Sequence, residues 1–357
     1  MPSHMRRVAI AFLLAVAVMS AAACGSSKSS SGSSGPQTVT LLTHDSFAVS
    51  KPVLAAFTAK TGIRVKIDRS SGDAGSALSQ AILTKDHPIA DAFYGLDNTF
   101  LSRALDAGIF EQWSAAGLDL VPKALQLDPS HRVTPIDYAD VCVNYDKAWF
   151  ASRNRVAPKT LADLVAPAYR DLTVVEKPST SSTGLAFLLA TVVRYGDPGW
   201  HDYWKRLRAN GVLVQPGWQQ AYEGSFTAGG GSGTRPIVVS YASSPPADVV
   251  YSSPKKSTPS IGVVADGCFR QVEFVGILKG TRHRDAAGRL VNFLLSLPFQ
   301  QDMPLQMFAF PARTDARLPT VFEKWAYRPD HPLAIDPATI ASHRDAWIDE
   351  WTNIVLR

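Results

Sequence analysis

The stretch that decides the fold reads Gly217-Trp218-Gln219-Gln220-Ala221-Tyr222, then a glycine-rich segment, then Arg235-Pro-Ile-Val-Val-Ser-Tyr-Ala-Ser-Ser-Pro-Pro246. Its apolar run of β-branched residues, 237–239, predicts a buried strand that the two prolines prevent from continuing. In open α/β sheets, ligands bind in the crevice beyond the carboxyl ends of strands. The aromatic and hydroxyl side chains that follow this run therefore suit a flat, polar small molecule. The alternative is that Trp218 and Tyr241 are simply core residues.

Strands and helices alternate on both sides of this stretch. The hydrophobic pattern predicts strands at 37–43, 63–67, 90–94, 140–145, 172–176 and 269–278, and helices at 52–60, 76–83, 99–106, 185–195, 285–297 and 337–355. Such alternation favours an α/β fold in which helices cover both faces of a parallel sheet. No G-x-G-x-x-G or P-loop motif follows any of these strands, so nothing in the sequence favours nucleotide binding.

The composition is that of a globular protein. The chain has 357 residues, of which 46% are hydrophobic and 19% charged, and it is long enough for two domains. The formal net charge is +5, and no cluster of Lys or Arg stands out. We therefore expect no nucleic-acid partner.

The N-terminus carries an export signal. Arg6 and Arg7 precede an apolar run, Val8–Met19, which small residues connect to Cys24. This pattern predicts a signal peptide over residues 1–23. Cys24 resembles the lipidated cysteine of a bacterial lipobox, and residues 24–36, nearly all Ser and Gly, predict a flexible tether. We expect a protein anchored by lipid at the outer face of the cytoplasmic membrane or in the periplasm; the alternative is a soluble secreted protein.

Two cysteines remain after export, Cys142 and Cys268. An even pair in an oxidising compartment is most simply a disulfide. A reactive thiol is the alternative. No His residue clusters with either cysteine, so we expect no metal site.

A run of hydroxyl residues, Ser179–Thr183, lies between a predicted strand and the helix at 185–195. Hydroxyls and free amides at a helix N-terminus form a site for anions. N-capping alone explains one such residue but not five in a row.

Several blocks occur together in one order: His44–Phe47, Tyr94–Asn98, Asp137-Tyr138, Asn144–Lys147, Ser179–Gly184, Gly217-Trp218, Ala221-Tyr222, Ser240–Pro245, Gln271–Glu273 and Ala346–Trp351. From about Thr38 to Arg357 the chain resembles the thiamine-binding substrate-binding proteins of bacterial ABC importers. The resemblance implies a two-lobed class II periplasmic binding protein fold with a hinge of crossover strands. It implies one lobe from 37–140 plus 272–357, a second from 141–271, and a monomer that delivers its ligand to an ABC permease.

The resemblance also implies a set of ligand contacts. The stacking residue matches Trp218, and Ser181 and Ser182 match the loop that holds a phosphate when one is present. Asp45 or Asp73 is a carboxylate that can neutralise a cationic ligand. The full set of expected contacts is Asp45, Asp73, Ala74, Ser181, Ser182, Trp218, Tyr241, Ala242, Ser243 and Ser244.

The chain departs from the family at three expected aromatic positions. These are His44, Ala247, where the family has tyrosine, and Phe308, where it has tryptophan. The departures predict an aromatic cage that is thinner or rebuilt.

The expected ligand is thiamine or one of its phosphates, bound without a cofactor and without catalysis. Thiamine has a flat aminopyrimidine and a permanently cationic thiazolium, and aromatic faces can stack on the first and attract the second. One alternative is a receptor for another cation such as ferric ion. Receptors for ferric ion need adjacent tyrosines as ligands, and this sequence has no Tyr-Tyr pair.

A second alternative is a thiaminase-like enzyme of the same fold, with Cys142 as its nucleophile. Crossover strands run side by side in this fold, and paired strands bring facing Cα atoms within reach of a disulfide. We therefore predict that Cys142 and Cys268 are bonded to each other.

Overall fold

The computed structural model describes residues 37–230 and 232–357. The predicted signal peptide (1–23), the lipidated Cys24 and the tether (24–36) lie outside the described residues. Among the helices of the described part, none has both the length and the apolar character that crossing a membrane requires.

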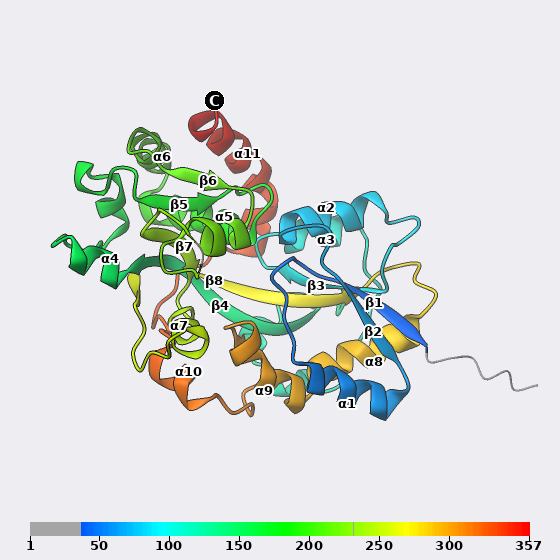
Figure 1. Cartoon of the computed structure of the whole chain (residues 1–357). Helices are drawn as coiled ribbons and strands as arrows, with labels where there is room; N and C mark the ends of the chain where they lie inside the picture. Colours follow the sequence, from blue (N-terminus) through cyan, green and yellow to red (C-terminus); the bar gives the residue numbers. More distant parts are fainter. Residues whose placement is uncertain (1–36, 231) are drawn as a thin grey trace, which may run out of the picture. The chain divides into compact units, whose positions relative to one another are not determined.

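A single nine-stranded sheet organises the described chain (Figure 1). Its strand order is β2-β1-β3-β8-β4-β7-β5-β6, and β9 pairs with β4 outside this path. The strands are β1 (Thr38–Leu42), β2 (Arg64–Asp68), β3 (Ala92–Asp97), β4 (Thr134–Asp146), β5 (Thr173–Glu176), β6 (Leu213–Gln215), β7 (Ile237–Tyr241), β8 (Ile261–Ile277) and β9 (Phe310–Pro311).

The sheet is mixed, and the predicted parallel sheet is correct only for its two ends. Strands β1, β2 and β3 are mutually parallel, as are β5, β6 and β7. In the centre, β8 is antiparallel to β3 and to β4, and β4 is antiparallel to β7. The reason is that β4 and β8 each run from one half of the sheet to the other, in opposite directions.

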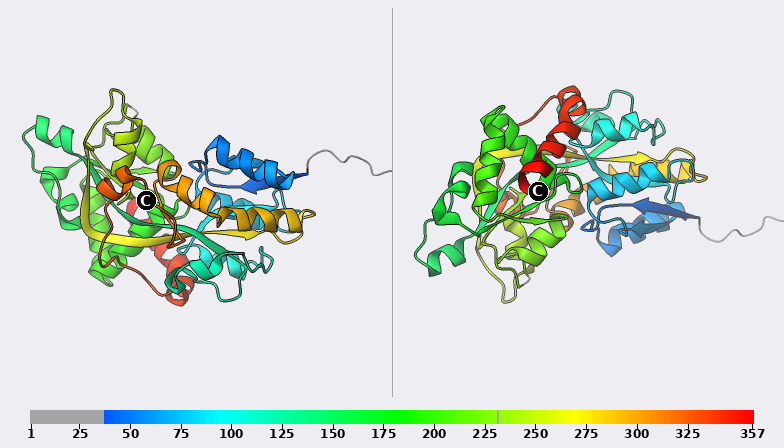
Figure 2. Two further views of the ribbon diagram at one scale, coloured as in Figure 1. Left: turned by 90° about the horizontal axis from the view of Figure 1, so that it is seen from below. Right: turned by 90° about the horizontal axis from the view of Figure 1, so that it is seen from above.

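Helices cover both faces of the β1–β3 half, with α2 and α3 on one side and α1, α8 and α9 on the other (Figures 1 and 2). The helices are α1 (Lys51–Thr61), α2 (Ala74–Leu83), α3 (Leu101–Asp106), α4 (Lys147–Ser152), α5 (Ser182–Tyr195), α6 (Gly199–Ala209), α7 (Pro245–Tyr251), α8 (Arg284–Leu294), α9 (Leu297–Gln306), α10 (Thr320–Trp325) and α11 (Pro337–Val355). Local signals set their ends: α1 stops at Gly62, whose φ of 72° few other residues adopt. Asp336 caps α11 by accepting from the amides of Ala338 and Thr339.

Two sequence predictions need correction. The helix predicted over 285–297 ends earlier, because α8 stops at Leu294 and a separate helix, α9, begins at Leu297 with a proline in its first turn. The strand predicted at 269–278 is only the second part of β8, which already begins at Ile261. Asp266 and Gly267 break the apolar pattern there, and the pairing with β4 shifts register in the same region.

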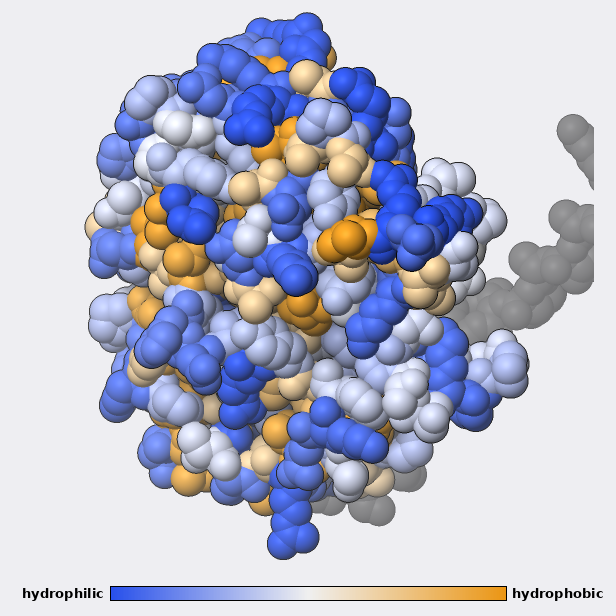
Figure 3. Space-filling view, turned by 90° about the vertical axis from the view of Figure 1, so that its left-hand side faces the viewer, coloured by the Kyte–Doolittle hydropathy of each residue, from blue (hydrophilic) through white to orange (hydrophobic). Residues whose placement is uncertain are grey.

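The core is continuous across the sheet. Residues 182–191 of α5 are all buried, because this helix packs against β4, β5, β7 and β8. Helix α11 contacts both α3 and α6, and Trp351 packs edge-on against Trp204 with 5.4 Å between ring centroids. On the face that carries α4, hydrophilic residues dominate and hydrophobic residues form small, separate patches (Figure 3).

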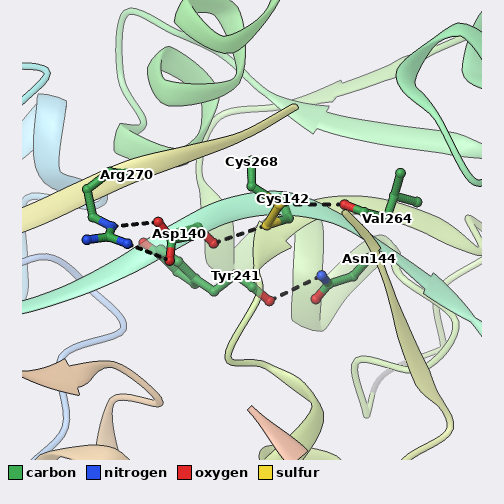
Figure 4. The surroundings of a disulfide bond; sticks show 7 residues. All are labelled: Asp140, Cys142, Asn144, Tyr241, Val264, Cys268 and Arg270. Atoms are coloured by element: carbon green, nitrogen blue, oxygen red, sulfur yellow. Dashed lines mark hydrogen bonds and ion pairs between the residues drawn. A yellow bond between two sulfur atoms is a disulfide. The ribbon is translucent and has the colours of Figure 1, made fainter. Parts of the chain in front are cut away.

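The predicted disulfide is confirmed. Cys142 on β4 and Cys268 on β8 are bonded, with an Sγ–Sγ distance of 2.07 Å and a Cα–Cα distance of 4.4 Å (Figure 4). Both side chains are buried beside Ala242. The bond joins the two central strands at the point where their register shifts.

Candidate ligand-binding site

A cavity of about 430 Å³ opens where the central strands meet the ends of β1 and β7. A volume of this size suits a small organic molecule. Its walls come from the loop after β1, from β4, β7 and β8, from a π-helical turn (Gln220–Ser225), from α7 and from the end of α9. The lining includes an aromatic wall (Trp218, Tyr222, Tyr241, Tyr251 and Phe308) and a polar floor (His44, Asp137, Gln271 and Glu273).

Neighbouring groups hold the Trp218 ring of the aromatic wall in place. The Trp218 indole stacks on Tyr222, with ring centroids 4.8 Å apart and an interplanar angle of 15°. Its Nε1–H donates to Ser240 Oγ at 2.9 Å. Tyr241 lies 6.3 Å from Trp218 between centroids, and Tyr251 packs edge-on against Phe308 at 5.7 Å. Stacking and the bond to Ser240 therefore order the Trp218 ring, whereas Tyr251 is an exposed member of the wall.

The polar floor is acidic. Glu273 on β8 lies directly opposite Asp137 on β4. Asp137 Oδ2 accepts from the Tyr94 hydroxyl at 2.5 Å, and Glu273 Oε1 accepts weakly from Gln271 Nε2 at 3.4 Å. No Lys or Arg is among the residues that line the cavity.

Three polar atoms of the floor have no hydrogen-bond partner among the described residues. They are Glu273 Oε2, Gln271 Oε1 and His44 Nε2. All three side chains are buried, and a buried polar atom without a partner carries a free-energy cost. A ligand with a positive charge or with N–H donors can remove that cost.

Burial sets the protonation of the floor. Burial raises the pKa of Glu273 well above its ordinary value, and the nearby acidic groups Asp137 and Asp97 raise it further. Burial also raises the pKa of Asp137. Burial lowers the pKa of His44 to about 4, so this imidazole is neutral at pH 7.

Of the ten residues predicted to contact the ligand, three line the cavity: Trp218, Tyr241 and Ser244. Seven do not: Asp45, Asp73, Ala74, Ser181, Ser182, Ala242 and Ser243. Most of the seven gather in a region where α2 and α5 begin. Ala242 and Ser243 are buried directly behind the end of β7, and Asp45 belongs to the loop before α1.

Asp73 connects three segments. Its Oδ1 accepts from the Ala74 amide at 2.6 Å, which caps α2, and its Oδ2 accepts from the Trp218 amide at 2.9 Å. Burial raises its pKa, while hydrogen bonds from Trp218 and from Ser181 act in the opposite direction. The carboxylate therefore positions the backbone of Trp218, the residue predicted to stack on the ligand.

The hydroxyl run caps α5 and contacts the other half of the sheet. Ser181 Oγ accepts from the Gly184 amide at 3.4 Å, and the Ser182 hydroxyl donates to the Asp97 carboxylate. The Gly75 amide at the start of α2 donates to the Thr180 carbonyl at 3.1 Å. The predicted anion position thus faces two carboxylates, Asp73 and Asp97.

The predicted contact set omitted the polar floor. Asp137, Gln271 and Glu273 all lie within the sequence blocks of the family resemblance, but in the interior of β4 and β8 and not at a strand end. A carboxylate between two apolar residues, Val272 and Phe274, inside a strand is the signal that could have identified Glu273. Tyr251 could have been found from Ala247, because residues four apart share one face of a helix, and both line the cavity from α7.

Comparisons with known proteins agree with this architecture. The chain is 30% identical over 324 residues to a thiamine-binding periplasmic protein of Salmonella typhimurium, covering 89% of this chain and 94% of that protein. The thiamine-binding periplasmic protein of Escherichia coli gives the same identity and coverage.

Two solved structures show the fold. A periplasmic thiamin-binding protein superposes with a TM-score of 0.79 at 28% identity, covering 90% of this chain and 96% of that one. A periplasmic binding protein from Actinobacillus pleuropneumoniae with bound fructose-6-phosphate gives a TM-score of 0.76 at 17% identity over 90% of this chain and 99% of that one, a likeness of fold alone. The chain has the two-lobed class II periplasmic binding protein fold, with β4 and β8 as its crossover strands.

The family profile described as "Bacterial extracellular solute-binding protein" matches residues 87–329. This match spans more than half of the chain, and the relatives above cover most of it. The chain belongs to the family of bacterial extracellular solute-binding proteins.

Proposed function

We propose that this protein is a lipid-anchored receptor that binds thiamine in the cavity and delivers it to the permease of an ABC importer. In this proposal residues 37–140 plus 272–357 form one lobe and residues 141–271 the other. The lobes close on the ligand about β4 and β8. Cys24 holds the receptor at the membrane, and membrane fractionation of a Cys24→Ala variant tests that anchor.

The observation that carries the proposal is an aromatic wall that faces an acidic floor across one small cavity. Thiamine has a flat aminopyrimidine for Trp218 and Tyr241 to stack on, and a fixed positive charge for the rings and carboxylates to attract. A cation over an aromatic face gains about 0.5–2 kcal/mol. The relatives named for thiamine binding support the same ligand.

Thiamine phosphates remain part of the proposal, with Ser181 and Ser182 as the phosphate site. The N-terminus of α5 favours an anion. In the present structure the Asp73 carboxylate already lies beside this position. Binding of a phosphate there therefore requires the starts of α2 and α5 to move apart or Asp73 to take up a proton.

We propose a receptor and not an enzyme. The thiaminase-like alternative needs a free Cys142 as nucleophile, and the disulfide with Cys268 supports the receptor because it consumes that thiol. The ferric-ion alternative needs a cluster of hard ligands. In residues 37–230 and 232–357, no group of three or more His, Cys, Asp or Glu side chains is arranged to hold a metal ion.

Titration calorimetry tests the proposal on protein freed of any co-purified ligand. We expect thiamine to bind one to one with a Kd below about 1 μM, and chromatography to recover it intact. Thiamine monophosphate, thiamine diphosphate and ferric citrate are titrated in parallel. No heat from any form of thiamine, binding of iron alone, or cleavage of the recovered thiamine would each contradict the proposal.

A further inference from the structure

Three carboxylates lie side by side across the centre of the sheet. Glu273 on β8 is paired with Asp97 on β3 and with Asp137 on β4. Directly opposed residues of antiparallel strands place their Cβ atoms about 4.5–5.5 Å apart, and like charges in such pairs repel. All three residues are buried, so water does not screen the repulsion.

The three carboxylates differ in their partners. Asp97 accepts from the Thr99 amide at 2.7 Å and from the Ser182 hydroxyl. Asp137 accepts from the Tyr94 hydroxyl. Glu273 has one weak donor, and its Oε2 is unpartnered at the cavity floor. Glu273 is therefore the member of the row best placed to meet a ligand.

No fixed cation within the described residues neutralises this row. His44 Nε2 lies 3.9 Å from Glu273 Oε2, but its imidazole is neutral at pH 7. Arg270, three residues before Glu273, is bound to Asp140, and Arg69 donates to the Phe47 carbonyl. The other titratable groups that face Glu273 are Asp73 from the start of α2, Tyr94 and Asp97 from β3, Asp137 from β4 and Tyr241 from β7, and none of them supplies a positive charge.

We propose that Glu273 is the counter-ion for the fixed positive charge of the ligand, and that the empty site holds a proton on the Glu273–Asp137 pair which leaves when the cation binds. This inference rests on the proposed function, because it takes the ligand to be permanently cationic. Protonated protein and thiamine cation give the complex and one proton, which passes to the buffer. Charge is conserved, since one positive charge replaces another beside the same carboxylates.

The exchange of a proton for thiamine determines whether the affinity for thiamine rises or falls with pH. A bound cation lowers the pKa of Glu273, which burial and its acidic neighbours hold high in the empty protein. Below the empty-state pKa, thiamine has to displace the proton, so its affinity increases as the pH rises. The limiting slope is about tenfold per pH unit for one proton. Above the empty-state pKa no proton remains to be displaced, and the affinity levels off.

Calorimetry of the wild-type protein measures the exchange directly. Thiamine is titrated between about pH 5 and pH 8, at each pH in two buffers with different enthalpies of ionisation. We expect the observed heat to depend on the buffer, with up to one proton released per thiamine bound, and the affinity to rise over the same range. Thiamine binding with no proton release and no change of affinity with pH would refute the inference and leave the proposed function standing.

A neutral analogue separates charge from shape. In 3-deazathiamine a neutral thiophene ring replaces the thiazolium. We expect Glu273→Gln to weaken thiamine binding at least about tenfold, to remove proton release, and to change binding of the analogue less than about twofold. Retained binding of the analogue also shows that the variant is folded.

The matched control is Glu323→Gln on α10, an exposed residue that does not line the cavity. It should leave both affinities unchanged. Equal weakening of thiamine and of the analogue by Glu273→Gln would assign Glu273 a packing role and refute the inference. Failure of the wild-type protein to bind thiamine would instead refute the proposed function, and the inference with it.

Discussion

Trp218 is fixed on several sides before any ligand arrives. Tyr222 stacks on its indole, Ser240 holds its ring nitrogen, and Asp73 holds its backbone amide. Such support matters because a ring that is already ordered loses little further entropy on binding. The sequence identified Trp218 as the stacking residue, and the structure places it in the cavity wall; its contact with a ligand stays a prediction.

We predict that Trp218→Ala weakens thiamine binding by about 1–3 kcal/mol, the range found for stacking of a base on an aromatic side chain. Trp218→Phe keeps a ring face but loses the bond to Ser240, so its thiamine affinity should lie between those of the wild-type protein and of Trp218→Ala. Calorimetry measures both variants, with Trp325→Ala on α10 as a control outside the cavity. An unchanged affinity in Trp218→Ala would return this residue to a purely structural role.

Single residues also show where sequence reasoning failed. Trp218 and Tyr241 stand at strand and loop ends, where a ligand role is readily suspected. Glu273 lies inside β8, and its neighbours along the chain, Val272 and Phe274, are apolar. Only the pairing of β8 with β3 and β4 brings Glu273 beside two further acids. That pairing is a long-range property, which local periodicity does not contain.

At the scale of elements, β4 and β8 determine how the two halves of the sheet are joined. The sequence pattern predicted the strands of the parallel ends except β6, which has only three residues. It found only part of β4 and β8, since a proline at 135 and a glycine at 267 interrupt patterns that the folded strands continue through. The disulfide fastens these strands to each other at their register shift.

We predict that replacing both cysteines by alanine lowers the free energy of unfolding by about 2–5 kcal/mol. Cys142 and Cys268 are 126 positions apart, and the stabilisation in the chain-entropy model grows with the length of the closed loop. Urea denaturation of the double variant measures the loss. Thiamine affinity should change little, because neither cysteine lines the cavity. A stability equal to that of the wild-type protein would contradict this account of the bond.

At the scale of the whole molecule, buried acids collect where the two halves of the sheet meet. Burial raises the pKa values of Asp73, Asp97, Asp137, Glu176 and Glu273, that of Asp97 to about 6. A folded protein with such groups binds more protons than its unfolded chain at the same pH. The contribution of these protonated carboxyl groups to the free energy of unfolding is therefore complete below the pKa that they have in the unfolded chain, near 4. It is lost as the pH rises through the higher pKa values that they have in the folded protein.

We predict that the ligand-free protein loses stability as the pH rises from about 5 to about 8. His44 contributes in the opposite direction, because its pKa of about 4 in the folded protein lies below its value in the unfolded chain, so its contribution to stability increases with pH. The several buried carboxyl groups together outweigh this single histidine. Thiamine should reduce the loss, because its charge replaces the missing protons. Urea midpoints at several pH values, with and without thiamine, measure both effects. A free protein that becomes more stable over this range would contradict the prediction.

We expect a single thiamine to bind in the central cavity with its charge against the acidic floor. A crystal structure of the thiamine complex tests this most directly. We predict density for both rings within the cavity, with the Trp218 ring stacked on one of them. The thiazolium nitrogen should lie within about 5 Å of the Glu273 carboxylate, where the attraction between the charges is strong. Density outside the cavity, or a thiazolium turned away from both Glu273 and Asp137, would contradict it.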